Sequence, residues 1–310
     1  MKVRVSAPSR LHLGLIDPFN VYGRMNGGVG LAIDEPRSTV IAEPFDGVTV
    51  EAPYREEVKV YVERVCTNYR LPGAKVTVLT TAPRHSGLGS TTQLALAVAK
   101  AVTKAYALEV NAVKLAKVLG RGSRSGVGTY AFQYGGFIVD GGRGPSTSFP
   151  PLIARYPFPE EWRIVMITAG EHGLSEEVED RVISSLPKPP LNVVLEASYT
   201  VLMGLIPSLL EGDFTLFTGS LSRLQRLVGK MFEAAQGGVF RSDIAKYVDL
   251  LSKAGALGVG QSSWGSTVYG FTQSWKEAEE VVSNLTDEVK TEARIVKADN
   301  EGAKVEILSC

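Results

Sequence analysis

The first half of the chain switches between strand-like and helix-like patterns of apolar positions. Apolar residues at every second position predict half-buried strands, whereas a repeat near 3.6 residues predicts an amphipathic helix. Val58, Val62 and Val65, for example, fall on one face of a single helix. The patterns predict strands at Val3–Ala7, Thr39–Glu43, Val48–Glu51, Lys75–Thr80 and Gly136–Asp140, and helices at Glu56–Tyr69, Thr92–Tyr106 and Ala112–Leu119.

The second half shows the same mixture, with more helix than strand. Gly141–Pro151 is rich in Gly, Pro and Ser and is the best candidate boundary, so we expect one domain over residues 1–150 and another over 151–310. Because strands and helices alternate without the regular period of a barrel, the pattern predicts an α+β fold in two layered domains. The predicted helices are Ser175–Leu186, Val193–Leu210, Phe214–Ala235, Ser242–Lys253 and Ser274–Asn284, and the predicted strands are Arg163–Thr168, Ala256–Gln261, Ser266–Thr272 and Glu292–Ala298.

The composition excludes several classes of protein. Lys+Arg and Asp+Glu both number 33, and this zero net charge argues against a nucleic-acid-binding surface. The two cysteines, Cys66 and Cys310, have no metal-type spacing and form no disulfide framework, which favours the reducing cytoplasm. The N-terminus lacks the apolar core of a signal peptide, and no run approaches the roughly 18 apolar residues of a membrane span. We therefore expect a cytoplasmic protein, with a buried helix where Val201–Leu210 is apolar.

The segment Ala82–Gln93, APRHSGLGSTTQ, carries the clearest chemical signal. It joins a predicted strand to a predicted helix, and the first N–H groups of a helix lack internal partners while the helix dipole is positive at that end. Gly87 and Gly89 allow the backbone to approach a ligand closely. This combination predicts a site for phosphate or diphosphate. The structural alternative is a simple turn in which Ser90 caps the helix.

Three segments, in the right order, resemble the motifs of the GHMP superfamily, which includes galactokinase and the homoserine, mevalonate and phosphomevalonate kinases. PRHSGLGSTTQLALAVA resembles the second motif, P-x-x-x-G-L-G-S-S, and Ala7–Asp17 (APSRLHLGLID) corresponds to the first. Gly255–Gly270 (GALGVGQSSWGSTVYG) lies where the third is expected, although it lacks the usual run of glycines. The resemblance implies an N-terminal domain like ribosomal protein S5, a ferredoxin-like C-terminal domain, and a site in the cleft between them.

Four collinear segments resemble one family more narrowly. PSRLHLGLID, GRMNGGVGLAIDEP, SGLGSTTQLALAV and RSGVGTYAFQYGGFIVDGG together are similar to the β-ribofuranosylaminobenzene 5′-phosphate synthases of the archaeal pathway to methanopterin-type pterins. The resemblance implies an enzyme that joins phosphoribosyl pyrophosphate to 4-hydroxybenzoate or 4-aminobenzoate and releases CO2 and pyrophosphate. It also implies Mg²⁺ at the leaving group, with unknown protein ligands, and a homodimer.

One residue separates this synthase from the kinases. Many GHMP kinases carry an aspartate in a segment S-G-x-D, where it acts as the base toward the substrate hydroxyl. Here Ser125–Gly128 reads SGVG, and a glycine cannot accept a proton, which favours the synthase. Some kinases of the superfamily work without this base, so an ATP-dependent small-molecule kinase stays open. A non-catalytic sensor on the same fold is a third hypothesis, against which the dense polar residues of all four motifs argue.

Charged residues of the N-terminal segment are the candidates for catalysis. Arg10 and His12 lie two positions apart and so share a strand face, and Asp17 and Arg24 lie in the loop that follows. We expect Arg10 and Arg24 to hold the anionic groups of the two substrates, because a planar guanidinium grips them bidentately. His12 or Asp17 would manage proton transfer or orientation. Each has a structural alternative, such as a surface salt bridge for Arg10 or a turn role for Asp17.

Further polar residues are expected to bind the phosphates. Arg121 and Arg124 are candidates for the ribose 5-phosphate, with ordinary solvated loop charge as the alternative. Trp264 and Tyr269 are either core residues or an aromatic wall for the benzoate ring, and His172 has only neighbouring glutamates in its favour. The expected phosphate and substrate contacts are His85, Ser86, Gly87, Gly89, Ser90, Thr91, Arg121, Arg124, Ser125, Ser262 and Ser263.

Overall fold

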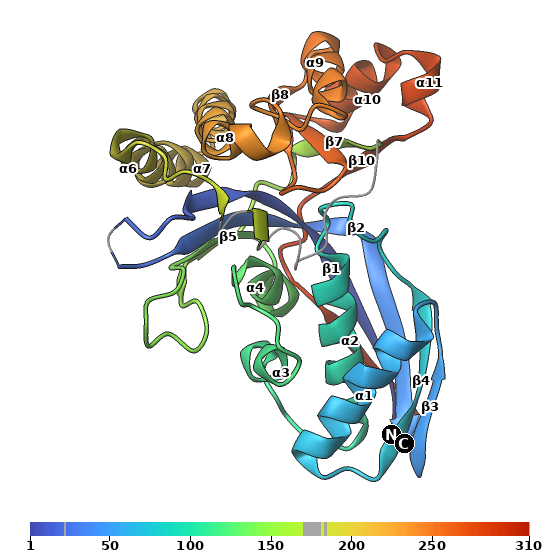
Figure 1. Cartoon of the computed structure of the whole chain (residues 1–310). Helices are drawn as coiled ribbons and strands as arrows, with labels where there is room; N and C mark the ends of the chain where they lie inside the picture. The colour runs from blue at the N-terminus through green and yellow to red at the C-terminus, as the bar shows by residue number, and fades with distance from the viewer. Residues whose placement is uncertain (22, 170–180, 183–184, 310) are drawn as a thin grey trace.

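Two β-sheets organise the residues that the computed structural model describes, which are 1–21, 23–169, 181–182 and 185–309. The larger sheet consists of β1 (Lys2–Asp17), β2 (Asn26–Pro44), β3 (Gly47–Glu51), β4 (Gly73–Thr80), β5 (Phe137–Asp140), β6 (Leu152–Tyr156) and β11 (Lys304–Ser309). Its strand order is β11-β1-β2-β4-β3, with β5 paired to β2 and β6 paired to β5. Both ends of the chain lie together at the foot of this sheet (Figure 1).

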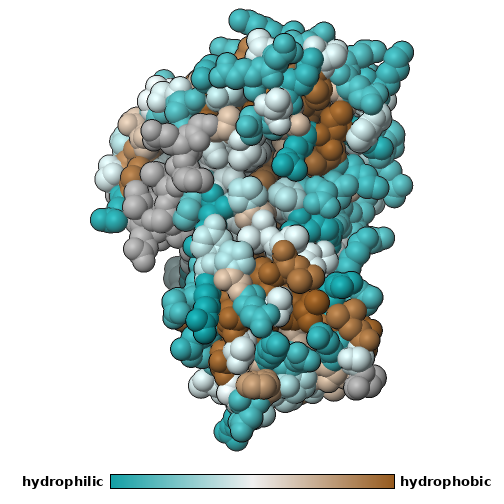
Figure 2. Space-filling view, turned by 90° about the vertical axis from the view of Figure 1, so that its right-hand side faces the viewer, coloured by the Kyte–Doolittle hydropathy of each residue, from teal (hydrophilic) through white to brown (hydrophobic). Residues whose placement is uncertain are grey.

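Four helices cover one face of the larger sheet (Figure 1). They are α1 (Arg55–Tyr69), α2 (Ser90–Ala105), α3 (Ala112–Val118) and α4 (Val127–Tyr134). The Ala/Leu/Val-rich α2 is buried along most of its length, because it lies between the sheet and the other helices. The opposite face is open over the outer part of the sheet, so Ile41 is only half-buried and Leu79 is exposed. Figure 2 shows apolar side chains gathered among polar ones in the lower half of this side.

The strands β1 and β2 extend well beyond Val3–Ala7 and Thr39–Glu43, the strands that the sequence predicts. Their outer halves pack residues such as Val5 into the core beneath α1 and α2. Their inner halves pack residues such as Leu13 into a second core that also contains residues of the smaller sheet. The hairpin of β1 and β2 therefore connects the two halves of the molecule.

The pairing of β1 with β2 changes register twice. One shift lies between Ala7 and Ser9, and the other lies between His12 and Gly14. Such bulges turn the following side chains to new directions and interrupt the strict alternation of buried and exposed residues. The simple alternating pattern therefore ends at Ala7 although the strand continues to Asp17.

The smaller sheet consists of β7 (Arg163–Thr168), β8 (Leu257–Gln261), β9 (Thr267–Thr272) and β10 (Ala293–Val296), in the order β10-β7-β9-β8. One face packs against α9 (Ala245–Ala254) and α10 (Trp275–Ser283), and α11 (Asp287–Lys290) follows them. The other face joins the second core together with the long helix α8 (Phe214–Gln236). Aromatic rings fill this core, with Phe217 in contact with Phe158, Trp162 and Phe271.

The apolar segment near residue 200 forms α6 (Leu191–Thr200), the π-helical turn η1 (Val201–Leu205) and α7 (Ile206–Glu211). Among the helices that the structure describes, Leu191–Glu211 is the one with the length and apolar composition of a membrane span, and 39% of the apolar window is buried in the protein. Leu205 is fully buried, whereas Leu202 is 64% exposed. The predicted burial of this helix is therefore right for one face only.

The predicted α+β class is confirmed, and α4, β6, α11 and β11 are additions that the sequence pattern did not predict. The strands β6 and β11 both join the larger sheet. Because β6 belongs to the larger sheet and β7 to the smaller one, the chain first changes sheets between them, a few residues beyond Gly141–Pro151. The division into domains at residue 150 stays a prediction. Most of the predicted helix Ser175–Leu186, and His172, lie outside the described residues.

Candidate active site

Arg10 and His12 extend from the middle of β1 into one pocket, as their spacing predicts. Both lie between the two register shifts, where loops from distant parts of the chain meet β1. The backbone N–H of Arg10 donates to the carbonyl of Leu88 at 3.0 Å, and its Nη1 donates to the carbonyl of Gly87. The backbone N–H of His12 donates to Ser262 Oγ at 2.9 Å. Hydrogen bonds thus hold this part of β1 to two loops, the one before α2 and the one between β8 and β9.

The loop before α2 presents the start of that helix to the pocket. Gly89 precedes the helix with a φ of +72°, and the helix begins at Ser90 without a side-chain cap. The capping role considered for Ser90 is therefore not observed. Gly89, Ser90 and Thr91 line the pocket. The first turn of a helix, with its N–H groups and positive dipole end, stabilises an anion at this position.

The loop before α2 and the loop between β8 and β9 meet backbone to backbone. A side chain on Gly87 would overlap the carbonyl of Ser262, and one on Gly265 would overlap the backbone of Gly87. Ser262 Oγ donates to the Gly87 carbonyl at 2.6 Å, and the N–H of Thr267 donates to the Ser86 carbonyl at 2.9 Å. The segment that resembles the third GHMP motif is therefore part of the site, although it lacks the usual run of glycines.

A buried carboxylate holds the loop before α4, which forms the third wall. Asp140 Oδ2 accepts hydrogen bonds from Ser125 Oγ and the N–H of Gly126, both at 2.8 Å, and its Oδ1 accepts one from the N–H of Gly142 at 2.8 Å. Burial raises the pKa of the Asp140 carboxyl, and the hydrogen bonds that it accepts oppose this rise. Asp140 thereby fixes the backbone that carries Arg124.

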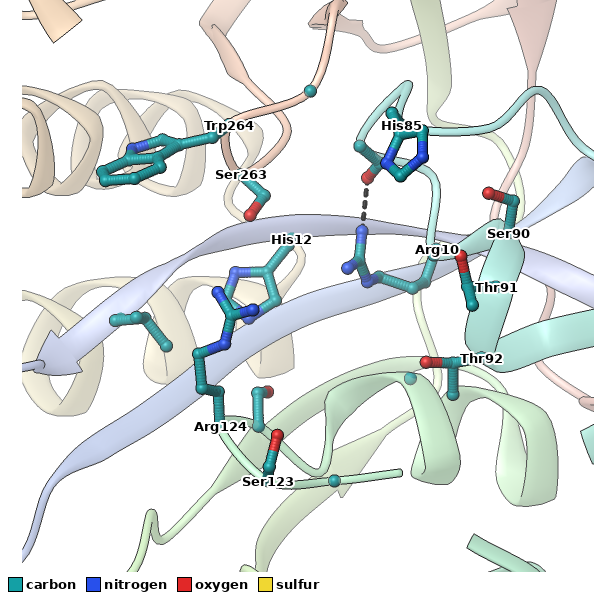
Figure 3. A pocket seen from close by; sticks show the side chains of 17 residues that line it. Arg10, His12, His85, Ser90, Thr91, Thr92, Ser123, Arg124, Ser263 and Trp264 are labelled. Atoms are coloured by element: carbon teal, nitrogen blue, oxygen red, sulfur yellow. Dashed lines mark hydrogen bonds between the residues drawn. The ribbon is translucent and has the colours of Figure 1, made fainter. Parts of the chain in front are cut away.

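These walls enclose a cavity of about 170 Å³, here called the main pocket. In Figure 3, Arg10, His12 and Arg124 lie in the middle of the view, between the hydroxyl groups at the start of α2 and the Ser263–Trp264 segment. Within the described residues, the lining contains two arginines and neither Asp nor Glu, so the main pocket attracts anions. The predicted residues that line it are Arg10, His12, His85, Gly87, Gly89, Ser90, Thr91, Arg124, Ser125 and Ser263.

His12 is neutral at physiological pH in these surroundings. Its side chain is only 7% exposed. Burial, followed by the positive charges of Arg10 and Arg124, lowers the pKa of His12 from 6.5 to about 3. A neutral imidazole accepts or donates a hydrogen bond but does not act as a proton donor near pH 7. The surroundings therefore favour an orienting role for His12.

Asp17 and Arg24 do not line the main pocket. Both oxygens of Asp17 accept backbone N–H groups of the turn that follows it, at 3.1 and 2.8 Å. Arg24 donates to the carbonyls of Gly141 and Gly142, at 2.8 and 3.0 Å. These contacts fix the tip of the hairpin formed by β1 and β2. The turn role considered for Asp17 is thus observed, and the predicted catalytic roles of both residues lack a position in the pocket.

Three predicted phosphate ligands also lie outside the pocket lining. Ser86 is buried, and its Oγ donates to the carbonyl of Pro83 at 2.7 Å. Ser262 Oγ accepts from the N–H of His12 and donates to the carbonyl of Gly87, so it connects its own loop with β1 and with the loop before α2. Arg121 precedes Arg124 in the same loop without reaching the main pocket. Ser86 and Ser262 support the loops, and a direct role in binding stays a prediction for all three.

The sequence matches the models of two known protein-family domains. The model of the GHMP kinase N-terminal domain matches residues 56–136, and the model of the GHMP kinase C-terminal domain matches residues 205–291. The chain belongs to the GHMP superfamily. The GHMP-type two-domain fold predicted from the sequence is confirmed by these matches.

Two curated archaeal relatives are named β-ribofuranosylphenol 5′-phosphate synthase. The protein of Methanothermobacter thermautotrophicus is 36% identical over 292 residues, covering 86% of this chain and 88% of the relative. The protein of Methanocaldococcus jannaschii is 34% identical over 335 residues, covering 97% of this chain and 99% of the relative. The predicted resemblance to this synthase family is therefore confirmed, and these relatives are enzymes.

Solved structures of GHMP kinases share the fold. A homoserine kinase from Cytophaga hutchinsonii superposes with a TM-score of 0.74 at 18% identity, covering 98% of this chain and 97% of that one. A putative homoserine kinase from Listeria monocytogenes has a TM-score of 0.70 at 17% identity, covering 99% and 100%. At these identities the likeness concerns the fold alone.

Gly128, which the sequence resemblance puts where many GHMP kinases carry an aspartate, lies on the wall of the main pocket. A Cβ at this position would lie 3.2 Å from the methyl group of Thr92. The carbonyl of Gly128 accepts a hydrogen bond from Gln93 Nε2 at 2.7 Å. The residue thus faces the ligand space, but it brings no carboxylate there.

Several lining residues were not among the predicted contacts. Ser123 adjoins the predicted Arg124, so extending the motif by one position would have found it, whereas the Thr92 hydroxyl was expected as a further donor of the anion loop and does line the pocket. Leu15 has the opposite parity to His12, and it reaches the same pocket only because the register shifts between them. Trp264, considered as an aromatic wall, lines the pocket, whereas Tyr269 is fully buried in the core.

A smaller cavity of about 60 Å³, here called the side pocket, adjoins the main pocket. Its aromatic wall includes Phe232 and Trp264, whose ring centroids are 5.2 Å apart. The two pockets share His12, Leu15, Arg124, Ser263 and Trp264. The residues that belong to the side pocket alone are Gly14, Gln225, Val228, Gly229, Phe232, Gln236, Val239 and Gln261.

Proposed function

We propose that this GHMP protein is a pentosyltransferase of methanopterin-type pterin biosynthesis, which joins phosphoribosyl pyrophosphate to 4-hydroxybenzoate or 4-aminobenzoate. The names of the archaeal relatives support this assignment. In the reaction, the bond from ribose C1 to oxygen breaks, and its electron pair leaves with pyrophosphate. The ring carbon that carries the carboxylate forms a bond to C1. The electron pair of the ring–carboxylate bond then returns to the ring as CO2 departs.

The absence of Asp and Glu from the described lining of the main pocket is the observation that carries the proposal. A hydroxyl kinase usually needs a base to accept the proton of its substrate. In the proposed reaction CO2 leaves the ring in place of a proton, so the ring needs no base. Both substrates are anions, and an acidic lining residue would repel them. The pocket therefore suits this substitution better than phosphoryl transfer to an alcohol.

The start of α2 is the proposed site of the diphosphate. Gly87, Gly89, Ser90 and Thr91 bring backbone and hydroxyl groups to this wall, and Arg10 lies against Gly89. Negative charge develops on the diphosphate as the bond to C1 breaks, and fixed donors stabilise it without reorganising. Each charge-assisted hydrogen bond contributes about 1.5–3 kcal/mol, so a few of them account for a large part of the acceleration.

We propose that Mg²⁺ enters with the diphosphate. The described residues contain no group of three or more His, Cys, Asp or Glu side chains able to hold a metal, and the main pocket has no carboxylate. Because Mg²⁺ prefers oxygen ligands and retains waters, diphosphate oxygens fit as its main ligands, with the Ser90 and Thr91 hydroxyl groups as oxygen ligands from the protein. When bound, the ion neutralises charge on the leaving group.

The test is an assay without nucleotide. Purified protein receives phosphoribosyl pyrophosphate, Mg²⁺ and carboxyl-labelled 4-hydroxybenzoate or 4-aminobenzoate, and the release of labelled CO2 and pyrophosphate is measured. We expect equal amounts of both products, with Arg124→Ala strongly impaired. Arg226→Ala is the matched control, because Arg226 is an exposed residue of α8 outside both pockets.

The alternatives predict different results in the same assay. Phosphorylation of homoserine, mevalonate or pantoate by ATP, without CO2 release from either benzoate, would establish the kinase. Binding of phosphoribosyl pyrophosphate without any turnover would establish the sensor. We also propose that the protein is a cytoplasmic homodimer. Analytical ultracentrifugation measures the mass of the particle and so tests the dimer.

A further inference from the structure

The side pocket is placed to hold part of a substrate ring. It opens off the main pocket beside His12 and Arg124, and its own walls come from β1, α8 and the end of β8. A cavity of about 150 Å³ accepts a whole benzene molecule, so the side pocket, at about 60 Å³, takes one end of a ring and leaves the other end in the main pocket. The position of charge decides which end enters.

Within the described lining of the side pocket, charge lies only at the end that meets the main pocket. Of the described residues that line the side pocket, Arg124 is the one that carries a charge at neutral pH, since burial keeps His12 neutral. Arg124 also lines the main pocket. A carboxylate in the far end of the side pocket would be buried without a cation, which costs several kcal/mol. The carboxylate therefore stays beside Arg124, and the opposite end of the ring enters the side pocket.

The far end of the side pocket is formed by three buried glutamines whose amide orientations are fixed. The backbone N–H of Gln261 donates to Gln225 Oε1 at 3.1 Å, and the N–H of Arg241 donates to Gln261 Oε1 at 2.9 Å. Gln261 Nε2 is therefore a donor, and it donates to Gln236 Oε1 at 3.2 Å. Gln236 Nε2 donates to the carbonyl of Val239 at 2.7 Å. Backbone groups thus set the direction of the whole chain of hydrogen bonds.

This direction leaves acceptor capacity at the far end. In the described structure Gln236 Oε1 accepts one hydrogen bond, and an amide oxygen accepts two. The amide hydrogens of Gln236 and Gln261 point to acceptors in the protein. The far end therefore stabilises a group that donates a hydrogen bond, such as a phenol O–H or an aromatic amine.

We propose that the side pocket binds the benzoate with its para hydroxyl or amino group toward Gln236 and its carboxylate beside Arg124. This inference rests on the proposed function and adds the orientation of the arene and a residue that selects it. The orientation suits the reaction, because the new bond to ribose C1 forms at the ring carbon that carries the carboxylate. That carbon then faces the main pocket, where the ribose is activated.

The first test compares 4-hydroxybenzoate with 4-fluorobenzoate, which is similar in shape but cannot donate a hydrogen bond. With pyrophosphate present, calorimetry of the wild type is expected to give at least about tenfold tighter binding of the hydroxy compound. In Gln236→Met, which keeps the side-chain volume, the ratio is expected to fall below about threefold. Equal affinities in the wild type, or an unchanged ratio in the variant, would overturn the inference.

The second test fills the side pocket. Val228→Phe is expected to raise KM for the benzoate at least about tenfold and to change KM for phosphoribosyl pyrophosphate less than threefold. Arg226→Phe, on the exposed side of α8, is the matched control and is expected to change neither. If Val228→Phe fails to fold in a thermal melt, the Gln236→Met comparison still decides.

The failure of the inference is distinguishable from the failure of the proposed function. A wild type that releases no CO2 from any benzoate contradicts the proposed function. A wild type that turns over normally, with benzoate KM unchanged in Val228→Phe and Gln236→Met, contradicts only the side-pocket inference.

Discussion

Two regions of the β1–β2 hairpin carry charged residues of the same N-terminal motif but use them differently. In the middle of β1, Arg10 and His12 face the main pocket. At the tip, Asp17 and Arg24 bind backbone groups of nearby turns. A strand rises about 3.3 Å per residue, which places Asp17 roughly 16 Å along β1 from His12. A continuous motif therefore combines residues that face the ligand with residues that shape the hairpin.

The largest effect is expected for Arg10→Lys. The guanidinium donates to the carbonyl of Gly87 and also lies against Gly89, whereas a lysine ammonium keeps the charge but lacks the planar fork. We expect kcat/KM to fall about 100-fold or more, equal to about 2.7 kcal/mol of transition-state stabilisation. Arg4→Lys is the matched control. Arg4 lies on β1, like Arg10, but it forms an exposed ion pair with Glu306 of β11. A loss below threefold for Arg10→Lys would remove the distinction between the middle of β1 and the hairpin tip.

The next effect concerns the loop that Arg10 contacts. Gly89→Val puts a branched side chain at a φ of +72° and against Arg10, so we expect pyrophosphate to bind at least about tenfold more weakly by calorimetry. Gly212→Val is the matched control, because Gly212 has a φ of +70° and open space where a Cβ would lie. Both variants lose stability through backbone strain, but only Gly89→Val is expected to lose binding. Equal binding by the two variants would show that the loop is structural.

Much of the fold was predictable because strong periodic patterns match buried faces. The helix Phe214–Ala235 and the strand Arg163–Thr168 are observed almost as predicted, as α8 and β7. The elements that the sequence did not predict lack such a pattern. The edge strand β11 is exposed along nearly its whole length, so no alternation marks it. Bulges hid most of β1 for a related reason, because they change which parity of residue is buried.

Much of the lining of the main pocket was predictable from the sequence, whereas the lining of the side pocket was not. The glycines and hydroxyl groups of the loop before α2 are neighbours in sequence, so local spacing reveals them. Gln225, Gln236 and Gln261 meet only through packing of α8 against β1 and β8, and no single segment shows their relation. Asp140 was likewise unpredictable as the support of Arg124, because the contact depends on the pairing of β5 with β2.

A smaller effect is the pH dependence of stability due to His12. Its pKa is about 3 in the folded protein and about 6.5 when unfolded, so the unfolded state binds more protons between these values. The free energy of unfolding therefore falls as pH is lowered from about 6.5, by up to about 1.4 kcal/mol per pH unit from this residue. His12→Gln removes this contribution, and urea unfolding at pH 7, 6, 5 and 4 is expected to give a flatter profile. Identical slopes for variant and wild type would contradict the neutral, buried imidazole.

The smallest effect on activity is expected at the hairpin tip. Asp17→Asn keeps one oxygen that can accept a backbone N–H but loses the charge and the second acceptor, so the free energy of unfolding is expected to fall by about 1 kcal/mol. Arg24→Lys loses the pair of donors that reaches Gly141 and Gly142, with a similar or smaller cost. Urea unfolding measures these losses.

Steady-state kinetics of the same two variants completes the comparison between the regions. Because neither side chain lines the main pocket, kcat/KM is expected to stay within about threefold of the wild type, which is less than 1 kcal/mol in transition-state terms. A loss of 30-fold or more in either variant at unchanged stability would mean that the tip reaches the substrate during turnover. The hairpin would then have to close over the main pocket, and the catalytic roles that the sequence predicts for Asp17 and Arg24 would be supported.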